Sequence, residues 1–399
     1  MTALRSLRAF PLPVRLLLVN QFGVNTGFYL LIPYLATYLG GGLGMSAAMI
    51  GVVLGVRTLS QQGLFLLGGT AADRLGPRRV IVAGCALRAV GFGLFAAGES
   101  VAVLLAASVL SGLAGALFNP AVRAYIAVEA AEDARAEAFA LFNVFGQAGA
   151  LTGPVLGSAL LLWDFRIAAL VAAGIFLVLT VAQAVVLPAR PVPAHRGTVL
   201  GDWRECLANR RFIAFTLALT GMFALQNQLY LVLPLQAQRA TGSAVGVALI
   251  FLVSTVATLL FQVRITRVLS TRMARGQAIA LGLAIMGVGF VATALADGIV
   301  PVLVATLLLS AGVMMAHPFV YELIPGFGPD DLAGTYFGMF YLASGVVAAV
   351  ANAAIGWTIS AAGRLASPLC VAIGLASAAG VFWLHRRGAL TPTRSEAAR

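Results

Sequence analysis

Residues 68–79 read GGTAADRLGPRR and lie between two long apolar segments, near 47–71 and 79–97. The stretch places an acidic residue, Asp73, beside Arg74, Arg78 and Arg79. Clustered arginines at the end of an apolar segment are typical of a cytoplasmic loop between membrane helices. The stretch therefore predicts a short, positively charged turn on the cytoplasmic side of a membrane.

The composition of the whole chain agrees with a membrane protein. Of 399 residues, 60% are hydrophobic and only 10% are charged, whereas a soluble domain has about 25% charged residues. Each long apolar run can cross about 30 Å of hydrocarbon, and its length favours a helix over a strand. Twelve such runs are predicted, near 15–39, 47–71, 79–97, 101–127, 137–162, 166–187, 211–238, 243–266, 277–296, 299–324, 333–358 and 367–385.

The arginines set the expected orientation. The chain has a formal charge of +12 and no lysine. Arginines cluster before the first run, in every second loop and after the last run, as expected if both termini are cytoplasmic. This placement explains the basic charge by topology and excludes nucleic acid as a partner. The three cysteines form no CxxC pair, so neither a zinc site nor a disulfide framework is expected.

The chain is predicted to consist of two similar halves. The longest polar stretch, 188–210, separates a six-helix bundle at 1–187 from a second at 211–399, and its part from about Thr198 could form an amphipathic helix on the membrane surface. At an offset of 198, the stretches 118–142 and 317–340 overlap so that Pro120 matches Pro318. The predicted fold class is an all-α membrane protein with 12 helices in two pseudo-symmetric bundles, a repeat arrangement used by secondary transporters.

The stretch at 68–79 resembles the loop signature of the major facilitator superfamily through Gly69, Asp73, Arg74, Gly76 and Arg78. The resemblance implies a conformational gate in which Asp73 faces the helix that begins near Gly334, and also Arg123. The alternative is a basic turn that only sets topology. The stretch is not the ATP-binding pattern G-x-x-x-x-G-K-[ST], so no nucleotide or other cofactor is expected, and transport should be driven by a gradient.

A second motif, GALTGPVLGS at 149–158, resembles the one that marks drug:proton antiporters of this superfamily through Gly149, Gly153, Pro154 and Gly157. Small residues at every fourth position give a helix a smooth face for close packing. Simple packing is the alternative interpretation. Along the whole chain the resemblance is greatest to MdtH-type multidrug exporters, which implies export rather than uptake.

Few polar groups are expected inside the membrane, where each is costly to bury. Glu322 is the first candidate for proton coupling and His317 the second, because no carboxylate lies deep in the first six helices; a gate or packing hydrogen bond is the alternative for both. Arg57 is predicted either to attract anions or form hydrogen bonds in the cavity, or to be held structurally by Asn20, Gln21 or backbone carbonyls of the first helix. The candidate cavity residues are Asn20, Gln21, Asn25, Arg57, Gln61, Arg88, Asn119, Gln147, Gln226, Asn227 and Tyr230.

The sequence thus predicts a monomeric, multi-pass transporter of the bacterial inner membrane. Its expected partners are a small-molecule substrate, protons and the lipid bilayer. We expect efflux of amphipathic drugs or metabolites by alternating access, in exchange for protons. Two alternatives remain: export of a specific anionic metabolite, natural product or siderophore with different or no proton coupling, and a receptor or scaffold that does not transport. Neither an enzyme nor a metal site is expected.

Overall fold

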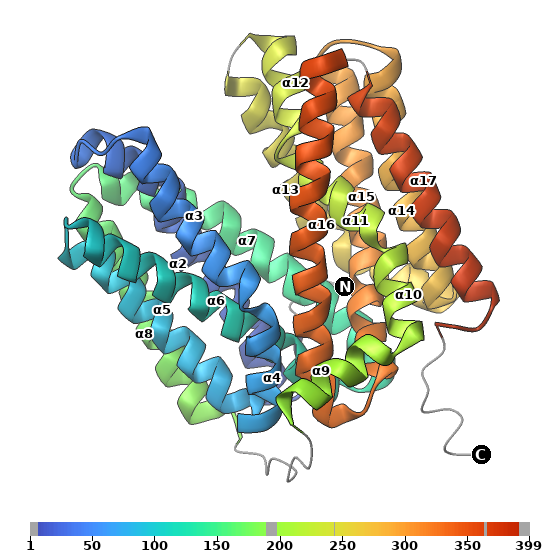
Figure 1. The fold of residues 1–399 in the computed structure, drawn as a ribbon, viewed down its shortest axis with the longest axis horizontal. Coiled ribbons are helices and arrows are strands. Elements are labelled where there is room, and N and C mark those ends of the chain that lie inside the picture. Colours follow the sequence, from blue (N-terminus) through green and yellow to red (C-terminus); the bar gives the residue numbers. More distant parts are fainter. Residues whose placement is uncertain (1–6, 189–197, 243, 363–364, 391–399) are drawn as a thin grey trace. The chain divides into compact units, whose positions relative to one another are not determined.

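The computed structural model describes residues 7–188, 198–242, 244–362 and 365–390, and these residues form helices and no strand (Figure 1). Eleven helical segments in them are long and apolar enough to cross a membrane. The predicted class of an all-α membrane protein is confirmed. The structure differs from the prediction at the second and the seventh of the twelve apolar runs, neither of which is one continuous helix.

The second apolar run is broken at Leu64, whose backbone (φ −104°, ψ 5°) ends one helix and begins the next. Glycine is a poor helix former, and Gly63 ends the first piece of 17 residues. The helices of the first half are α2 (Leu12–Thr37), α3 (Ala47–Gly63), α4 (Phe65–Leu75), α5 (Pro77–Ala97), α6 (Val101–Glu129), α7 (Arg135–Leu161) and α8 (Phe165–Val186).

The second half also contains a broken apolar run. The segment predicted at 211–238 consists of three short helices joined at Leu219 and by a 3-10 turn. The helices here are α10 (Arg210–Ala218), α11 (Thr220–Gln226), α12 (Val232–Thr241), α13 (Ala244–Arg272), α14 (Arg275–Leu295), α15 (Ile299–Leu323), α16 (Ala333–Ala362) and α17 (Ala366–Arg386). The described linker residues form α9 (Val199–Ala208), the amphipathic helix that the sequence predicts.

The linker helix α9 buries one side of its short length. Asp202 is only 5% exposed and Cys206 is fully buried, whereas Leu200 and Leu207 are exposed. Its buried side contacts α4 through Arg74 and Thr70.

The chain divides into two compact units. Unit 1 comprises Met1–Ala131, Leu141–Cys206 and Gly328–Leu342, and unit 2 comprises Glu132–Ala140, Leu207–Phe327 and Ala343–Arg399. Each unit therefore contains the start of one helix whose remainder lies in the other: the first turns of α16 belong to unit 1, and those of α7 belong to unit 2. The division into bundles at 1–187 and 211–399 stays a prediction.

Small residues allow close helix packing inside each unit, as is usual for membrane helices. In unit 1, α5 packs on α6 and α8, and Gly91 lies where a Cβ would be 3.0 Å from the backbone nitrogen of Ser111. In unit 2, α14 packs on α15 and α17, and Gly287 lies where a Cβ would be 3.0 Å from the Cα of Gly374. These cores hold the site helices in place.

Candidate functional site

A polar joint in unit 1 lies between α4 and the first turn of α16. Both carboxylate oxygens of Asp73 accept hydrogen bonds there: Oδ1 from the backbone N–H of Gly334 (2.7 Å), and Oδ2 from the N–H and hydroxyl of Thr335 (2.6 Å each). The first amides of a helix have no partner within the helix and carry a partial positive charge, so a carboxylate suits them. We call this the α4–α16 contact.

Glycine brings the two helices of the α4–α16 contact together. A Cβ on Gly69 would overlap the carbonyl oxygen of Gly334, and one on Gly334 would lie 2.6 Å from Oδ1 of Asp73. Neither position has room for a larger residue. The contact that the sequence predicts between Asp73 and the helix starting near Gly334 is therefore present, while its role as a gate stays a prediction.

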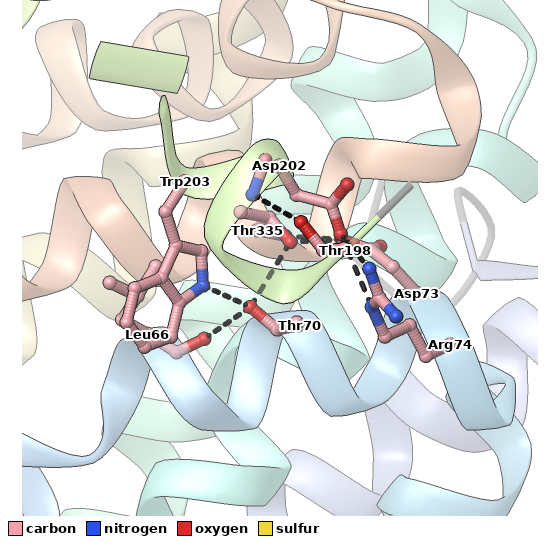
Figure 2. Close-up of polar contacts among 9 residues, drawn as sticks. Leu66, Thr70, Asp73, Arg74, Thr198, Asp202, Trp203 and Thr335 are labelled. Carbon is pink, nitrogen blue, oxygen red and sulfur yellow. Dashed lines mark hydrogen bonds and ion pairs between the residues drawn. The ribbon is translucent and has the colours of Figure 1, made fainter. Parts of the chain in front are cut away.

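The linker helix α9 covers the α4–α16 contact (Figure 2). Arg74 donates to Oδ2 of Asp202 from Nε (3.2 Å) and from Nη2 (2.7 Å). The indole of Trp203 donates to the hydroxyl of Thr70 (2.8 Å), whose oxygen also lies 3.3 Å from the hydroxyl oxygen of Thr335. One threonine thus joins all three helices.

Burial raises the pKa of the Asp73 carboxyl to about 7. The hydrogen bonds from Thr335 and Gly334 act in the opposite direction, and the nearby Asp331 adds to the increase. Desolvation is the larger effect because it penalises the charged form of an acid. Asp73 can therefore change its protonation near neutral pH while α16 is bound.

Cys206 on α9 should be chemically inert while the α4–α16 contact is formed. Burial, together with the carboxylates of Asp73, Glu205 and Asp202, raises the pKa of its thiol to about 12. Because the thiolate is the reactive species, we expect a Cys85→Ser, Cys370→Ser variant to react with N-ethylmaleimide at least roughly a hundredfold more slowly when native than when denatured. Similar rates in the two states would contradict this expectation.

The other residues of the predicted gate lie around this contact. Gly76 has a positive φ of 88°, a conformation that favours glycine, and it precedes α5. Arg78 donates to the carbonyl oxygen of Ala184 at the end of α8 (2.5 Å). Within the described residues, Asp73 forms no ion pair with Arg123, contrary to the expectation from the family. The Arg123 guanidinium instead lies over the rings of Phe142 (4.9 Å) and Tyr341 (5.0 Å), where aromatic faces attract a cation.

Unit 2 has a corresponding joint at the start of α7. Arg267 on α13 pairs with Glu137 (2.5 Å) in the first turns of α7. Arg275 pairs with Glu322 through Nε (2.7 Å) and lies 3.5 Å from Glu132. Glu322, the first candidate for proton coupling, is thus in an ion pair. Its role in coupling stays a prediction.

The remaining polar candidates of unit 2 lie on α11, α15 and the turn after α11. Nε2 of His317 is 3.1 Å from Oε1 of Gln226. Asn227 donates to the carbonyl oxygen of Phe223 in its own helix (2.8 Å), and Tyr230 is 64% exposed and packs on Phe251. Of these candidates, the structure brings His317 and Gln226 together.

In unit 1, a line of polar groups connects α2 with α7. Nε2 of Gln21 donates to Asn25 (3.3 Å), which donates to the carbonyl oxygen of Gly146 (2.8 Å). Asn20 is also buried, and its Nδ2 has no partner among the described residues. Asn119 and Gln147 are half-buried. The alternative in which Asn20 or Gln21 holds Arg57 is not found here, because the hydrogen bonds of Arg57 go to Gln61 and Thr58.

The glycines of the second motif form the face of α7 that packs on α2. A Cβ on Gly153 would lie 2.8 Å from the carbonyl oxygen of Thr26, and Cβ atoms on Gly149 and Gly157 would overlap those of Phe22 and Leu30. The hydroxyl of Tyr34 donates to the carbonyl oxygen of Pro154 (2.8 Å). This is the close approach that small residues at every fourth position predict.

The sequence did not predict the partners of the α4–α16 contact or of the joint at the start of α7. Asp202 and Trp203 lie in a polar linker, and only the amphipathic pattern of α9 signals that one side is covered. The pairing of Glu137 with Arg267 had no sequence signal beyond their places at the ends of apolar runs. Contacts between residues 130 positions apart are set by the fold rather than by local spacing.

Comparison with known proteins agrees with this architecture. The family model described as Major Facilitator Superfamily matches residues 17–352. An uncharacterized MFS-type transporter of Mycobacterium tuberculosis is 43% identical over 371 residues, covering 90% of this chain and 88% of the relative. The multidrug resistance protein MdtH of Cronobacter sakazakii is 31% identical, with 94% and 95% covered.

Solved structures show the same fold. The human organic anion transporter MFSD10 has a TM-score of 0.75 at 17% identity, covering 94% of this chain and all of that one. The fucose:proton symporter FucP of Escherichia coli has a TM-score of 0.74 at 17% identity, covering 92% and 98%. The chain is a multi-pass membrane transporter. It belongs to the major facilitator superfamily, whose members act on small-molecule substrates.

Proposed function

We propose that this transporter exports small amphipathic drugs or metabolites across the bacterial inner membrane by alternating access, in exchange for protons. The observation that carries the proposal is the α4–α16 contact. It joins residues about 260 positions apart through one carboxylate and two glycines. Such a contact can open and close as a unit, which alternating access requires of a gate.

The direction of transport is inferred from two observations. The glycine face of α7 that packs on α2 carries the motif typical of drug:proton antiporters, and the relative from Cronobacter sakazakii is named a multidrug resistance protein. Export is therefore favoured over uptake. In this proposal both termini are cytoplasmic, the protein acts as a monomer, and Asp73, Arg74 and the helices around them form the cytoplasmic gate.

Proton coupling is tested by flux into proteoliposomes with an imposed pH gradient, using an amphipathic fluorescent dye such as sulforhodamine B. We expect dye movement in exchange for protons, and we expect Glu322→Gln to transport without responding to the gradient, because glutamine cannot carry a proton. His317→Gln is tested in parallel. Wild-type flux that ignores the gradient contradicts antiport, and full coupling in Glu322→Gln excludes this residue as the carrier.

A further inference from the structure

Arg88 on α5 is a buried cation whose charge interacts with the Cys85 thiol and with Arg57. The residue is only 5% exposed, and its guanidinium forms no hydrogen bond or ion pair with the other described residues. Three aromatic rings surround the guanidinium instead: its Cζ lies 5.9 Å from the ring centroid of Phe28 and 5.6 Å from those of Phe118 and Phe176. Cation–π contacts offset only part of the cost of removing the charge from water.

A second arginine lies close to the first. The Cζ of Arg57 on α3 is 5.2 Å from the ring centroid of Phe28, so this ring contacts both guanidinium groups. Nη1 of Arg57 donates to Oε1 of Gln61 (3.2 Å). At Gly115 a Cβ would lie 3.0 Å from Nε2 of Gln61 and 3.1 Å from Nη2 of Arg88, so Gln61 lies between the two arginines.

This cluster lacks a negative charge. Neither arginine pairs with a carboxylate in the part of the chain that the structure describes, and Nε of each is buried without a partner. Ionisable groups inside membrane proteins usually pair with one another. Two neighbouring cations repel each other, which adds to the cost, and an anion placed beside them would remove both penalties.

We propose that Arg57, Arg88 and Gln61 bind the anionic group of an organic anion that this protein transports. The proposal rests on the transport function above and narrows its substrate class. Planar guanidinium groups with several donors suit carboxylate, sulfonate or phosphate oxygens. The half-buried Arg57 makes first contact, and Arg88 supplies the second charge from behind Phe28.

The test is equilibrium binding to the purified full-length protein in lipid nanodiscs, without any gradient. The probes are 1-naphthoate and its neutral counterpart 1-naphthamide, measured by calorimetry. We expect naphthoate to bind at least tenfold more tightly than the amide, and Arg88→Gln to remove this preference. Equal binding of the two probes to the wild type overturns the proposal, as does Arg88→Gln that keeps the preference. Export or proton coupling can fail in liposomes without affecting this binding, so the two proposals are separable.

Two further variants and one salt complete the design. Arg204→Gln, which removes an exposed charge on α9, should bind naphthoate like the wild type. If Arg88→Gln does not fold, Arg57→Gln provides the same test.

Sodium phosphate distinguishes an organic from an inorganic anion. We expect millimolar phosphate to leave naphthoate binding unchanged. Displacement of naphthoate by an equal concentration of phosphate would overturn the organic-anion class. The unliganded Arg88→Gln variant, which lacks the unpaired charge, should also have a higher melting temperature than the unliganded wild type.

Discussion

Gly69→Ala will separate α4 from the first turn of α16 and abolish transport. The added methyl group would overlap the backbone carbonyl of Gly334, and a backbone group cannot rotate away as a side chain can. The buried Cys206 thiol interacts with Asp73 and with the Tyr336 side chain, so it lies beside this contact. We therefore expect opening of the contact to accelerate its labelling by N-ethylmaleimide at least tenfold in the Cys85→Ser, Cys370→Ser background.

Two neighbouring glycines provide matched controls for Gly69→Ala. Gly63 has open space at the Cβ position, so Gly63→Ala should label and transport like the wild type. At Gly68 a Cβ would overlap the carbonyl oxygen of Ala116 on α6, within the first half of the chain, so Gly68→Ala should lower thermal stability instead. Normal transport and slow Cys206 labelling in Gly69→Ala would show that the contact is not needed.

Asp73→Ala will weaken the same contact by leaving the N–H groups of Gly334 and Thr335 without their acceptor. Loss of a helix cap costs about 0.5–2 kcal/mol, and buried donors without a partner add about 1–3 kcal/mol. We therefore expect faster Cys206 labelling and a loss of most flux. Asp73→Asn keeps one acceptor oxygen and should retain much of the contact.

The protonation of Asp73 makes the contact depend on pH. Its pKa is about 7 when α16 is bound, against an ordinary value of 3.8. Between these values the bound state holds a proton that the separated state releases, so the contact is most stable at low pH, weakens as pH rises through this range, and is constant above about pH 7. The native-to-denatured labelling ratio of Cys206 should rise accordingly from pH 5 to pH 7. Asp73→Asn should show no such change, and a pH-independent wild type would contradict the expected sign.

The sequence predicts the helices of this protein well because membrane helices are defined by length and hydrophobicity. It does not predict the break at Leu64, which depends on one backbone conformation beside Gly63. Gly69 and Asp73 of the proposed gate could be predicted because they belong to a recognisable motif. The contacts of Asp202 with Arg74 and of Trp203 with Thr70 could not be predicted, because they join segments about 130 positions apart.

The short distance between α9 and α10 has a mechanical consequence. Only Asn209 separates Ala208 from Arg210, and its side chain is fixed by bonds to the N–H of Phe212 (3.0 Å) and the carbonyl oxygen of Phe327 (2.6 Å). The chain therefore passes from α9 to α10 through one held residue, which leaves few backbone dihedral angles free to change between the two helices.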